Sequence, residues 1–306
     1  MYCFFISARW QNGVNNMQIN GKTRVCGLIG NPVEHSISPL IHNTVAELTG
    51  NNLAYVTFRV LNDDVEAAVK GAKALNILGL NVTVPHKQAV IASLKEIDPL
   101  ARAIGAVNTL VSVEGGYKGY NTDIIGFKRS LTDEGVTVKN EKIIILGAGG
   151  ASRAIAFLLA REGASKIYLL NRTYDKAKDI ADAVNKEYNR IVVQPMLMSD
   201  YDKLPDERFL CVQTTSVGLF PHVDDVVIDD AGFYKKIHTG MDIIYNPSKT
   251  RFMKLVEDNG GAAYNGLKML LYQGIAAYEL WNDITVSPEN VKAVLEKMKE
   301  AMNIHD

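Results

Sequence analysis

The sequence has little that would tie it to a membrane, a metal ion or an oxidising compartment. It holds only three cysteines in 306 residues, and no apolar run approaches the ~20 residues that span a bilayer. Cys26 and Cys211 lie far apart in apolar runs, which favours reduced core thiols over disulfide partners or zinc ligands. The six histidines show no metal-ligand spacing. We therefore expect a cytoplasmic protein without a metal.

The chain also lacks an excess of charge of either sign. Its 33 basic and 34 acidic residues give a net charge of −1, so nucleic acid and anionic membrane are not expected as partners. It has no Gly-x-Ser-x-Gly nucleophile motif, no paired-cysteine motif, no internal repeat and no low-complexity tract. A small-molecule substrate fits this composition. The oligomeric state is left open, with a homodimer as one option.

The length predicts two domains. Residues 1–20 are expected to precede the fold as an N-terminal extension. Met17 comes just before the first clear strand, so residues 1–16 are either a disordered tail or the product of a misassigned start. The apolar patch from Tyr2 to Ile6 is too short, and lacks the basic flank, for a secretory signal.

Strand and helix patterns alternate through the first part of the chain, which indicates a mostly parallel α/β sheet. Strands are predicted at 24–30 and 53–60, and an amphipathic helix at 63–75. Another helix should begin with Ser38 as its N-cap and Pro39 in its first turn. Ser36 and Ser38 then gather at a helix N-terminus, where they could simply cap the helix or form a clamp for an anion.

The stretch Asn81–Lys87 is the one around which the chain is organised. Its valines alternate with polar residues, and Pro85 must end the strand because proline cannot donate to a ladder. Lys87 is therefore predicted at a strand-to-helix corner. A lone lysine there is usually solvated. Further on, Asn108 and Asp123 stand at the ends of apolar segments. Each of them alone is most simply interpreted as a turn-forming residue.

A second domain begins after a linking helix at 124–138. A continuous apolar strand at 142–146 leads into a glycine-rich turn and then a helix at 154–161. Gly147 and Gly149 suit a tight turn with close approach of the backbone to a pyrophosphate, and Ser152 is a small-residue variation at the third position. This context predicts a dinucleotide site.

The strand at 166–170 ends in Asn171-Arg172-Thr173, where NAD-binding domains usually carry an acidic residue. Arg172 offers a planar cation to the 2′-phosphate, which favours NADP. Further strands are predicted at 191–193, 209–213 and 240–244, with loops at their ends. An apolar helix at 266–281 contains Gln273, which either faces a ligand or bonds to backbone.

Taken in order, these stretches resemble the shikimate dehydrogenase family of NADP-dependent enzymes, from about Val25 to Trp281. The matching segments are His35 to Pro39, Asn81 to Lys87, Ala106 to Thr109, Asn121 to Asp123, Gly147 to Ala151, Asn171 to Thr173, Thr215 to Gly218 and Met269 to Gln273. Two positions depart: Ile124 stands where the family usually has glycine, and Lys268 lies beside positions expected to face the ligand.

The resemblance implies the fold, the division of the chain and the chemistry. It implies an α/β protein with an N-terminal, mostly parallel substrate domain (21–122 plus 266–306) and a Rossmann-type NADP-binding domain (123–265). The C-terminal helices would pack back on the substrate domain. The expected reaction is reversible reduction of 3-dehydroshikimate to shikimate by NADPH.

The resemblance also assigns roles. Lys87 and Asp123 would form the catalytic pair. The substrate would be held by Ser36, Ser38, Thr83, Asn108 and Gln273. The cofactor would be held by Gly147, Ala148, Gly149, Gly150, Ala151, Asn171, Arg172, Thr173, Thr215 and Gly266. The alternatives are a quinate/shikimate dehydrogenase of broader specificity, and a metabolite sensor that keeps the fold without turnover. A folate-linked dehydrogenase of similar plan suits the serine pair less well.

Overall fold

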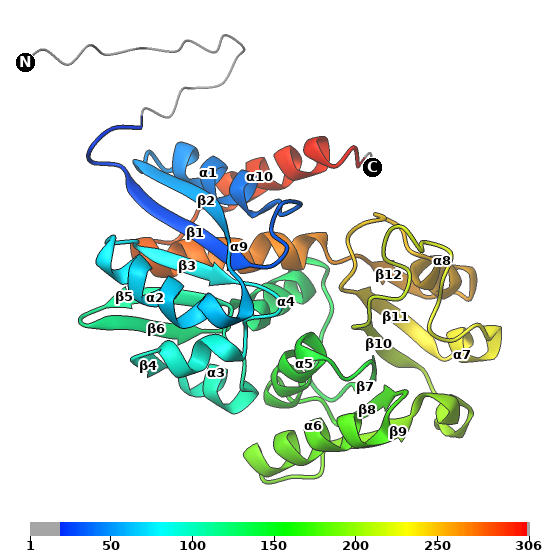
Figure 1. Ribbon diagram of the computed structural model, residues 1–306. Helices are drawn as coiled ribbons and strands as arrows, with labels where there is room; N and C mark the ends of the chain where they lie inside the picture. The colour runs from blue at the N-terminus through cyan, green and yellow to red at the C-terminus, as the bar shows by residue number, and fades with distance from the viewer. Residues whose placement is uncertain (1–18, 305–306) are drawn as a thin grey trace, which may run out of the picture.

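A computed structural model describes residues 19–304 of the chain, which fold around two six-stranded sheets (Figure 1). The expected extension therefore lies outside the described residues, except for Ile19 and Asn20. Strands β1 to β6 form the first sheet and β7 to β12 the second. The two sheets belong to separate halves of the molecule, as Figure 1 shows, and this is the two-domain α/β architecture expected from the sequence.

The first sheet has the strand order β2-β1-β3-β5-β6-β4. Its strands are β1 (Arg24–Gly30), β2 (Leu53–Arg59), β3 (Gly79–Val82), β4 (Glu96–Ile97), β5 (Thr109–Val113) and β6 (Gly116–Tyr120). β1 pairs in parallel with β2 and β3, and β4 with β6, whereas β5 runs antiparallel to both of its neighbours. β5 and β6 form a hairpin, and Gly115 at its turn has a φ of +73°, a conformation that favours glycine.

The helices of this half largely follow the predicted pattern. They are α1 (Ser38–Leu48), the 3₁₀ turn η1 (Asn62–Asp64), α2 (Val65–Ala74), the 3₁₀ helix η2 (Ala89–Ser93) and α3 (Pro99–Ile104). The expected N-cap at Ser38 was wrong by one residue. Ile37 occupies the N-cap position and has no side-chain cap, while Ser38 is the first helical residue. The Ser38 hydroxyl is thus not used for capping.

The corner that carries Lys87 also differs from the prediction. β3 ends at Val82, before the proline, and the residues up to the 3₁₀ helix η2 form turns. The backbone still follows β1 beyond the strand, because Thr83 N donates to Ile29 O at 3.0 Å and Asn31 N donates to Val84 O at 3.1 Å. Val84 is 62% exposed, so the alternation that suggested a longer strand continues without a ladder.

The second sheet is entirely parallel, with the order β12-β11-β10-β7-β8-β9. Its strands are β7 (Lys142–Leu146), β8 (Lys166–Asn171), β9 (Val193–Leu197), β10 (Phe209–Gln213), β11 (Ile237–Asp242) and β12 (Ala262–Tyr264). Its helices are α5 (Gly150–Arg161), α6 (Tyr174–Glu187), the 3₁₀ segment η3 (Met198–Lys203), α7 (Ala231–Lys235) and α8 (Arg251–Asp258). The strands predicted at 191–193 and 240–244 were misplaced, and β12 was not predicted.

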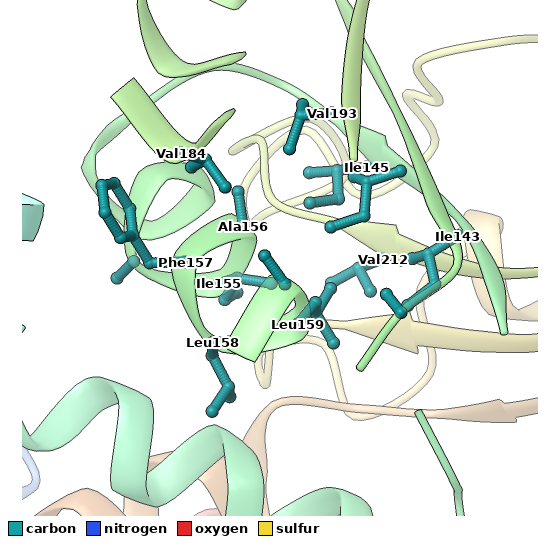
Figure 2. Close-up of a cluster of buried hydrophobic side chains, with 14 of the residues drawn as sticks. Ile143, Ile145, Ile155, Ala156, Phe157, Leu158, Leu159, Val184, Val193 and Val212 are labelled. Carbon is teal, nitrogen blue, oxygen red and sulfur yellow. The ribbon is translucent and has the colours of Figure 1, made fainter. Parts of the chain in front are cut away.

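The core of this half explains why the sheet forms. Figure 2 shows Ile143 and Ile145 of β7 packed with the apolar side chains of α5 and with Val212 of β10. Because both faces of a parallel sheet are covered, its central strands are continuously apolar. β7 therefore stands out in the sequence, and the turn after it lies at the carboxyl edge of the sheet.

Two late helices return to the first half. α9 (Leu267–Asn282) packs against α4 (Thr122–Asp133), the helix that joins the two sheets, and α10 (Pro288–Ala301) packs against α1 (Figure 1). Trp281 on α9 donates from Nε1 to Leu110 O of β5 at 2.9 Å. Lys268 forms ion pairs with Asp133 at 2.6 Å and Glu134 at 2.7 Å, so it serves the α4–α9 contact.

Three negative findings hold for residues 19–304. No helix there has the length and apolar character needed to cross a membrane. No group of three or more His, Cys, Asp or Glu side chains there is placed to hold a metal ion. Cys26 and Cys211 are both buried and unpaired with each other, as the sequence predicted.

Candidate active site

A cavity of about 400 Å³ collects most of the side chains that the sequence singled out. Its walls come from the first sheet, from the start of α4, from α9 and from the end of β11. The lining includes Ser36, Ser38, Asn81, Thr83, Lys87, Asn108, Asp123, Ala151, Ile243, Tyr245, Gly266, Met269 and Gln273. All seven residues assigned to catalysis or substrate thus meet in one cavity, although they come from distant parts of the chain.

Lys87 and Asp123 are in direct contact. Lys87 Nζ lies 2.7 Å from Asp123 Oδ2, with side-chain exposures of 33% and 16%. The turn that carries Lys87 is fixed by its neighbours, because Val107 N donates to Lys87 O at 2.8 Å and the buried His86 ring bonds to Val60 O. Asp123 lies in the first turn of α4, where the helix dipole favours a carboxylate. Both side chains are therefore held on fixed backbone.

Asn108 completes this group. Its Nδ2 donates to Asp123 Oδ1 at 2.9 Å, and its Oδ1 accepts from Thr122 N at 2.7 Å. Both oxygens of Asp123 consequently have a donor, one from a cation and one from an amide. Asn108 is only 3% exposed, so its amide is fixed by protein groups rather than by bulk water.

The remaining candidate substrate residues surround this pair. Ser36 Oγ accepts from Ser38 N at 3.2 Å, so the two serines share one turn at the start of α1. Thr83 follows β3 and Gln273 faces the cavity from α9. Gln273 Nε2 donates to Leu270 O at 2.9 Å, so this residue both bonds to backbone and lines the cavity.

The turn after β7 is open to a phosphate. α5 begins at Gly150 and has no side-chain cap, so the N–H groups of its first turn are not used by a capping residue. A Cβ built on Gly149 or Gly150 would meet nothing within 4 Å. Gly147 differs, because its φ is +104° and a Cβ there would lie 2.8 Å from Thr215 Cγ2. These features fit a dinucleotide pyrophosphate at the N-terminus of α5.

The end of β8 presents an unpaired cation. The exposed side chain of Arg172 has no ion-pair partner among the residues that the structure describes. Asn171 Nδ2 donates to Thr173 O at 2.9 Å and so shapes this loop. These three residues lie outside the cavity wall, at the same carboxyl edge of the second sheet as the glycine turn.

Two further cofactor candidates have structural reasons for their identity. Gly266 lines the cavity, and a Cβ on it would lie 2.1 Å from Ile243 O, so the close approach of two backbone segments requires glycine. Thr215 is not in the cavity wall. Its Oγ1 accepts from Val217 N at 3.1 Å and stabilises the loop beside Gly147.

The sequence placed Tyr245 in a loop at the carboxyl edge of the second sheet without assigning it a role, and it did not single out Asp242, although both belong to this region. Tyr245 lines the cavity, and burial raises its pKa above the ordinary value. Asp242 ends β11 and is 2% exposed, and burial raises its pKa to about 7 against the opposing Ile244 N–H and Thr250 hydroxyl. The signal was their place after a sheet strand, but the predicted strand end at Ile244 was two residues late.

The fold and this site define a two-domain α/β protein of the dinucleotide-linked dehydrogenase class. Profiles of three domains match the chain: "Shikimate dehydrogenase substrate binding domain" at residues 28–110, "Shikimate / quinate 5-dehydrogenase" at 130–203 and "Shikimate 5'-dehydrogenase C-terminal domain" at 266–296. The NADP(+) shikimate dehydrogenase of Desulforamulus reducens is 43% identical over 93% of this chain and 98% of its own length. The chain belongs to the shikimate dehydrogenase family.

Solved structures agree with this placement. A shikimate dehydrogenase crystallised with NADP+ has a TM-score of 0.84 and 37% identity, covering 94% of this chain and 99% of its own. The Listeria monocytogenes shikimate 5-dehydrogenase, in complex with shikimate and NAD, has a TM-score of 0.85 and 31% identity, covering 92% and 99%.

Proposed function

We propose that this protein catalyses the reversible, NADPH-linked reduction of 3-dehydroshikimate to shikimate in aromatic amino acid biosynthesis. One observation carries the proposal for this chain: the Lys87–Asp123 contact of 2.7 Å lies in a cavity whose wall includes Ala151, beside the open glycine turn. A hydride source at that turn and a proton source at Lys87 would then act on one substrate.

In this proposal Lys87 is the acid–base group. The dinucleotide, when bound, supplies the hydride, and negative charge develops on the carbonyl oxygen of the substrate. The Lys87 ammonium stabilises that charge and donates a proton from Nζ, while Asp123 orients the ammonium. In the reverse direction neutral Lys87 accepts the alcohol proton. Such acid–base catalysis contributes typically ~10²–10⁴-fold in rate.

The other cavity residues would bind the substrate. We assign the carboxylate to Ser36 and Ser38, which present hydroxyls at the start of α1, where the dipole favours an anion. We assign the ring oxygens to Thr83, Asn108 and Gln273. Gln273 can donate its second Nε2 hydrogen, because the hydrogen bond to Leu270 O uses only one.

NADP would be held along the edge of the second sheet. We assign the pyrophosphate to the turn from Gly147 to Ala151 and the 2′-phosphate to the loop from Asn171 to Thr173. Thr215 and Gly266 would border the nicotinamide side. The unpaired Arg172 guanidinium supports a preference for NADP, since phosphate recognition by arginine is charge-assisted and often bidentate.

We also retain the domain division of residues 21–122 plus 266–306 and residues 123–265. It is supported by the contacts of α9 and α10 with the first half. A cytoplasmic location completes the proposal, and a homodimer stays one option for the oligomeric state. A broader quinate/shikimate dehydrogenase is the second candidate, because one matching profile covers both substrates.

The test is the initial rate of oxidation of shikimate and of quinate, each with NADP and with NAD, for wild type and Lys87→Ala. We expect turnover with shikimate and NADP, reduced about 10²–10⁴-fold in the variant. Lys95→Ala is the matched control, because Lys95 lies in the same half of the molecule but not in the cavity wall. Comparable rates with quinate would favour the second candidate. Absence of turnover with every pair would support a metabolite sensor.

A further inference from the structure

In the cavity wall and behind it, buried polar side chains form a continuous row that ends at the catalytic pair. Tyr55 OH donates to Asn81 Oδ1 at 2.8 Å, and Asn81 Nδ2 donates to Thr109 Oγ1 at 3.1 Å. Thr109 Oγ1 donates to Asn108 Oδ1 at 3.1 Å, and Asn108 Nδ2 donates to Asp123 Oδ1 at 2.9 Å. Four consecutive hydrogen bonds therefore connect Tyr55 of β2 with Asp123 of α4.

The direction of these bonds is set by the donors that each group has. Tyr55 has one hydroxyl hydrogen and gives it to Asn81 Oδ1. The amide of Asn81 then uses Nδ2 on Asn108 O at 3.3 Å and on Thr109 Oγ1. Thr109 Oγ1 accepts from Asn81, so its own hydrogen can go to Asn108 Oδ1 at 3.1 Å or to the Thr122 hydroxyl at 3.0 Å. When Thr109 donates to Asn108, every donor in the row points toward Asp123.

Burial makes this arrangement hard to change. Tyr55 is 2% exposed, Asn81 5%, Asn108 3% and Thr109 0%. Reversing either amide would place two donors or two acceptors against each other without water to relieve them, and an unpaired buried polar group is costly. Thr109 does not line the cavity, so it acts on the site only through its neighbours.

We propose that Thr109 is a positioning residue for the catalytic pair, and that Tyr55 and Asn81 fix the direction in which its hydroxyl donates. Thr109 holds Asn108 Oδ1, so the Asn108 amide presents N–H rather than C=O to Asp123. Asp123 is thereby kept as an acceptor oriented toward Lys87. This inference rests on the proposed reaction.

The test is the steady-state kinetics of Thr109→Val, Thr109→Ser and the control Thr44→Val, a buried threonine of α1 outside this row. The backbone N–H and the hydroxyl of Thr122 also donate to Asn108 Oδ1, so we expect kcat of Thr109→Val to fall about tenfold rather than vanish, the scale of one lost hydrogen bond. KM for shikimate should change less than about twofold. Thr109→Ser, which keeps the hydroxyl, should restore kcat.

A double-mutant cycle with Asp123→Asn shows whether the effect passes through Asp123. In that background Thr109→Val should lower kcat no further, because the oriented carboxylate is already absent. A tenfold further loss would overturn the inference, as would an unchanged kcat of Thr109→Val in an active enzyme. If Thr109→Val does not fold, Tyr55→Phe is measured in the same cycle with the same criteria. Lack of turnover by wild type would instead overturn the proposed function.

Discussion

Single side chains in this protein owe their roles to the groups around them. Lys87 on a turn would be an ordinary surface lysine, but Asp123 and the wall of a cavity surround it. Arg172 shows the opposite condition, a guanidinium without an ion-pair partner in the described part of the chain. An unpaired cation beside a nucleotide-binding fold has its full charge available for a ligand.

Arg172→Gln should reduce the preference for NADP over NAD. Loss of a charge-assisted hydrogen bond of about 1.5–3 kcal/mol corresponds to about a 10- to 100-fold change in the ratio of kcat/KM values. The control is Lys176→Gln, which removes one positive charge from a nearby exposed position on α6. A ratio unchanged by Arg172→Gln would show that the 2′-phosphate lies elsewhere.

Asp242→Asn should change how stability depends on pH. The folded-state pKa of Asp242 is raised to about 7 from 3.8, so the folded protein retains a proton that the unfolded chain has released. The contribution of Asp242 to stability is therefore fully present below about pH 4 and is lost as the pH rises toward 7, by at most about 1.4 kcal/mol per pH unit. Asparagine cannot titrate, so this loss should disappear.

The measurement is urea unfolding of wild type and Asp242→Asn at intervals from pH 4.5 to 7.5. The stability of the variant relative to wild type should increase with pH. Asp229→Asn is the control for loss of one carboxylate, because Asp229 is 65% exposed and pairs with Arg251 at the surface. A parallel curve for Asp242→Asn would contradict the prediction.

Local patterns in the sequence identified the residue types of the site, but they did not show that these residues lie together in one cavity. Lys87, Asn108 and Asp123 each had an unremarkable alternative as a surface lysine or a turn former, and only the ordered set of family motifs favoured a site. Tyr245 was placed in a loop but given no role, and Asp242 was placed inside a strand, because the end of a buried strand is not marked by its apolar residues. Thr109 was missed for another reason, since a threonine in a strand is ordinary and its partners are distant in sequence.

At the scale of elements, the turn between β7 and α5 contains glycines that are needed for two different reasons. Gly147 is needed by the backbone, because its positive φ and its contact with Thr215 exclude a side chain. Gly149 has ordinary φ and open space around it, so the fold does not require glycine there. Only a bound phosphate would require glycine at this position.

Alanine at these two positions should therefore have opposite effects. Gly147→Ala should lower the free energy of unfolding by about 1–3 kcal/mol. Gly149→Ala should change it by less than about 1 kcal/mol but raise KM for NADP at least about tenfold, because the methyl group enters the space assigned to the pyrophosphate. Urea unfolding and initial rates of both variants distinguish the cases. Equal losses of stability would show that both glycines serve the turn alone.

The sequence predicted elements best where one signal dominated. β1, β7 and β10 were found with their correct bounds because each is a continuous apolar run. β12 was missed because three residues at a sheet edge carry no periodicity. β3 was drawn too long because alternation continues into Val84, where hydrogen bonding to the sheet has already ended.

At the scale of the molecule, the first half depends on segments from both ends of the described chain. Val294 and Met298 of α10 are fully buried in the cluster that contains Val45 of α1 and Tyr278 of α9. The second sheet has its own cluster around β7 and α5. The antiparallel β5 and the return of the last helices depend on long-range packing, and the latter was expected only from the family resemblance.

Met298→Ala should affect the two halves unequally. Removing a buried methionine side chain costs about 2–5 kcal/mol. Amide hydrogen exchange should become faster in β1 and α1, while β7 and β10 keep their protection, because α10 packs mainly against α1 and α9. Equal loss of protection in both sheets would show that the molecule unfolds as a single cooperative unit.

The return of α9 and α10 has a consequence for the order in which the protein is completed during synthesis. The second sheet has all its strands once residue 264 has left the ribosome. β1 and α1 are made first, yet their apolar faces stay uncovered until residues 267–301 follow. The half that is begun first is therefore finished last, and the substrate side of the cavity is complete only when α9 docks.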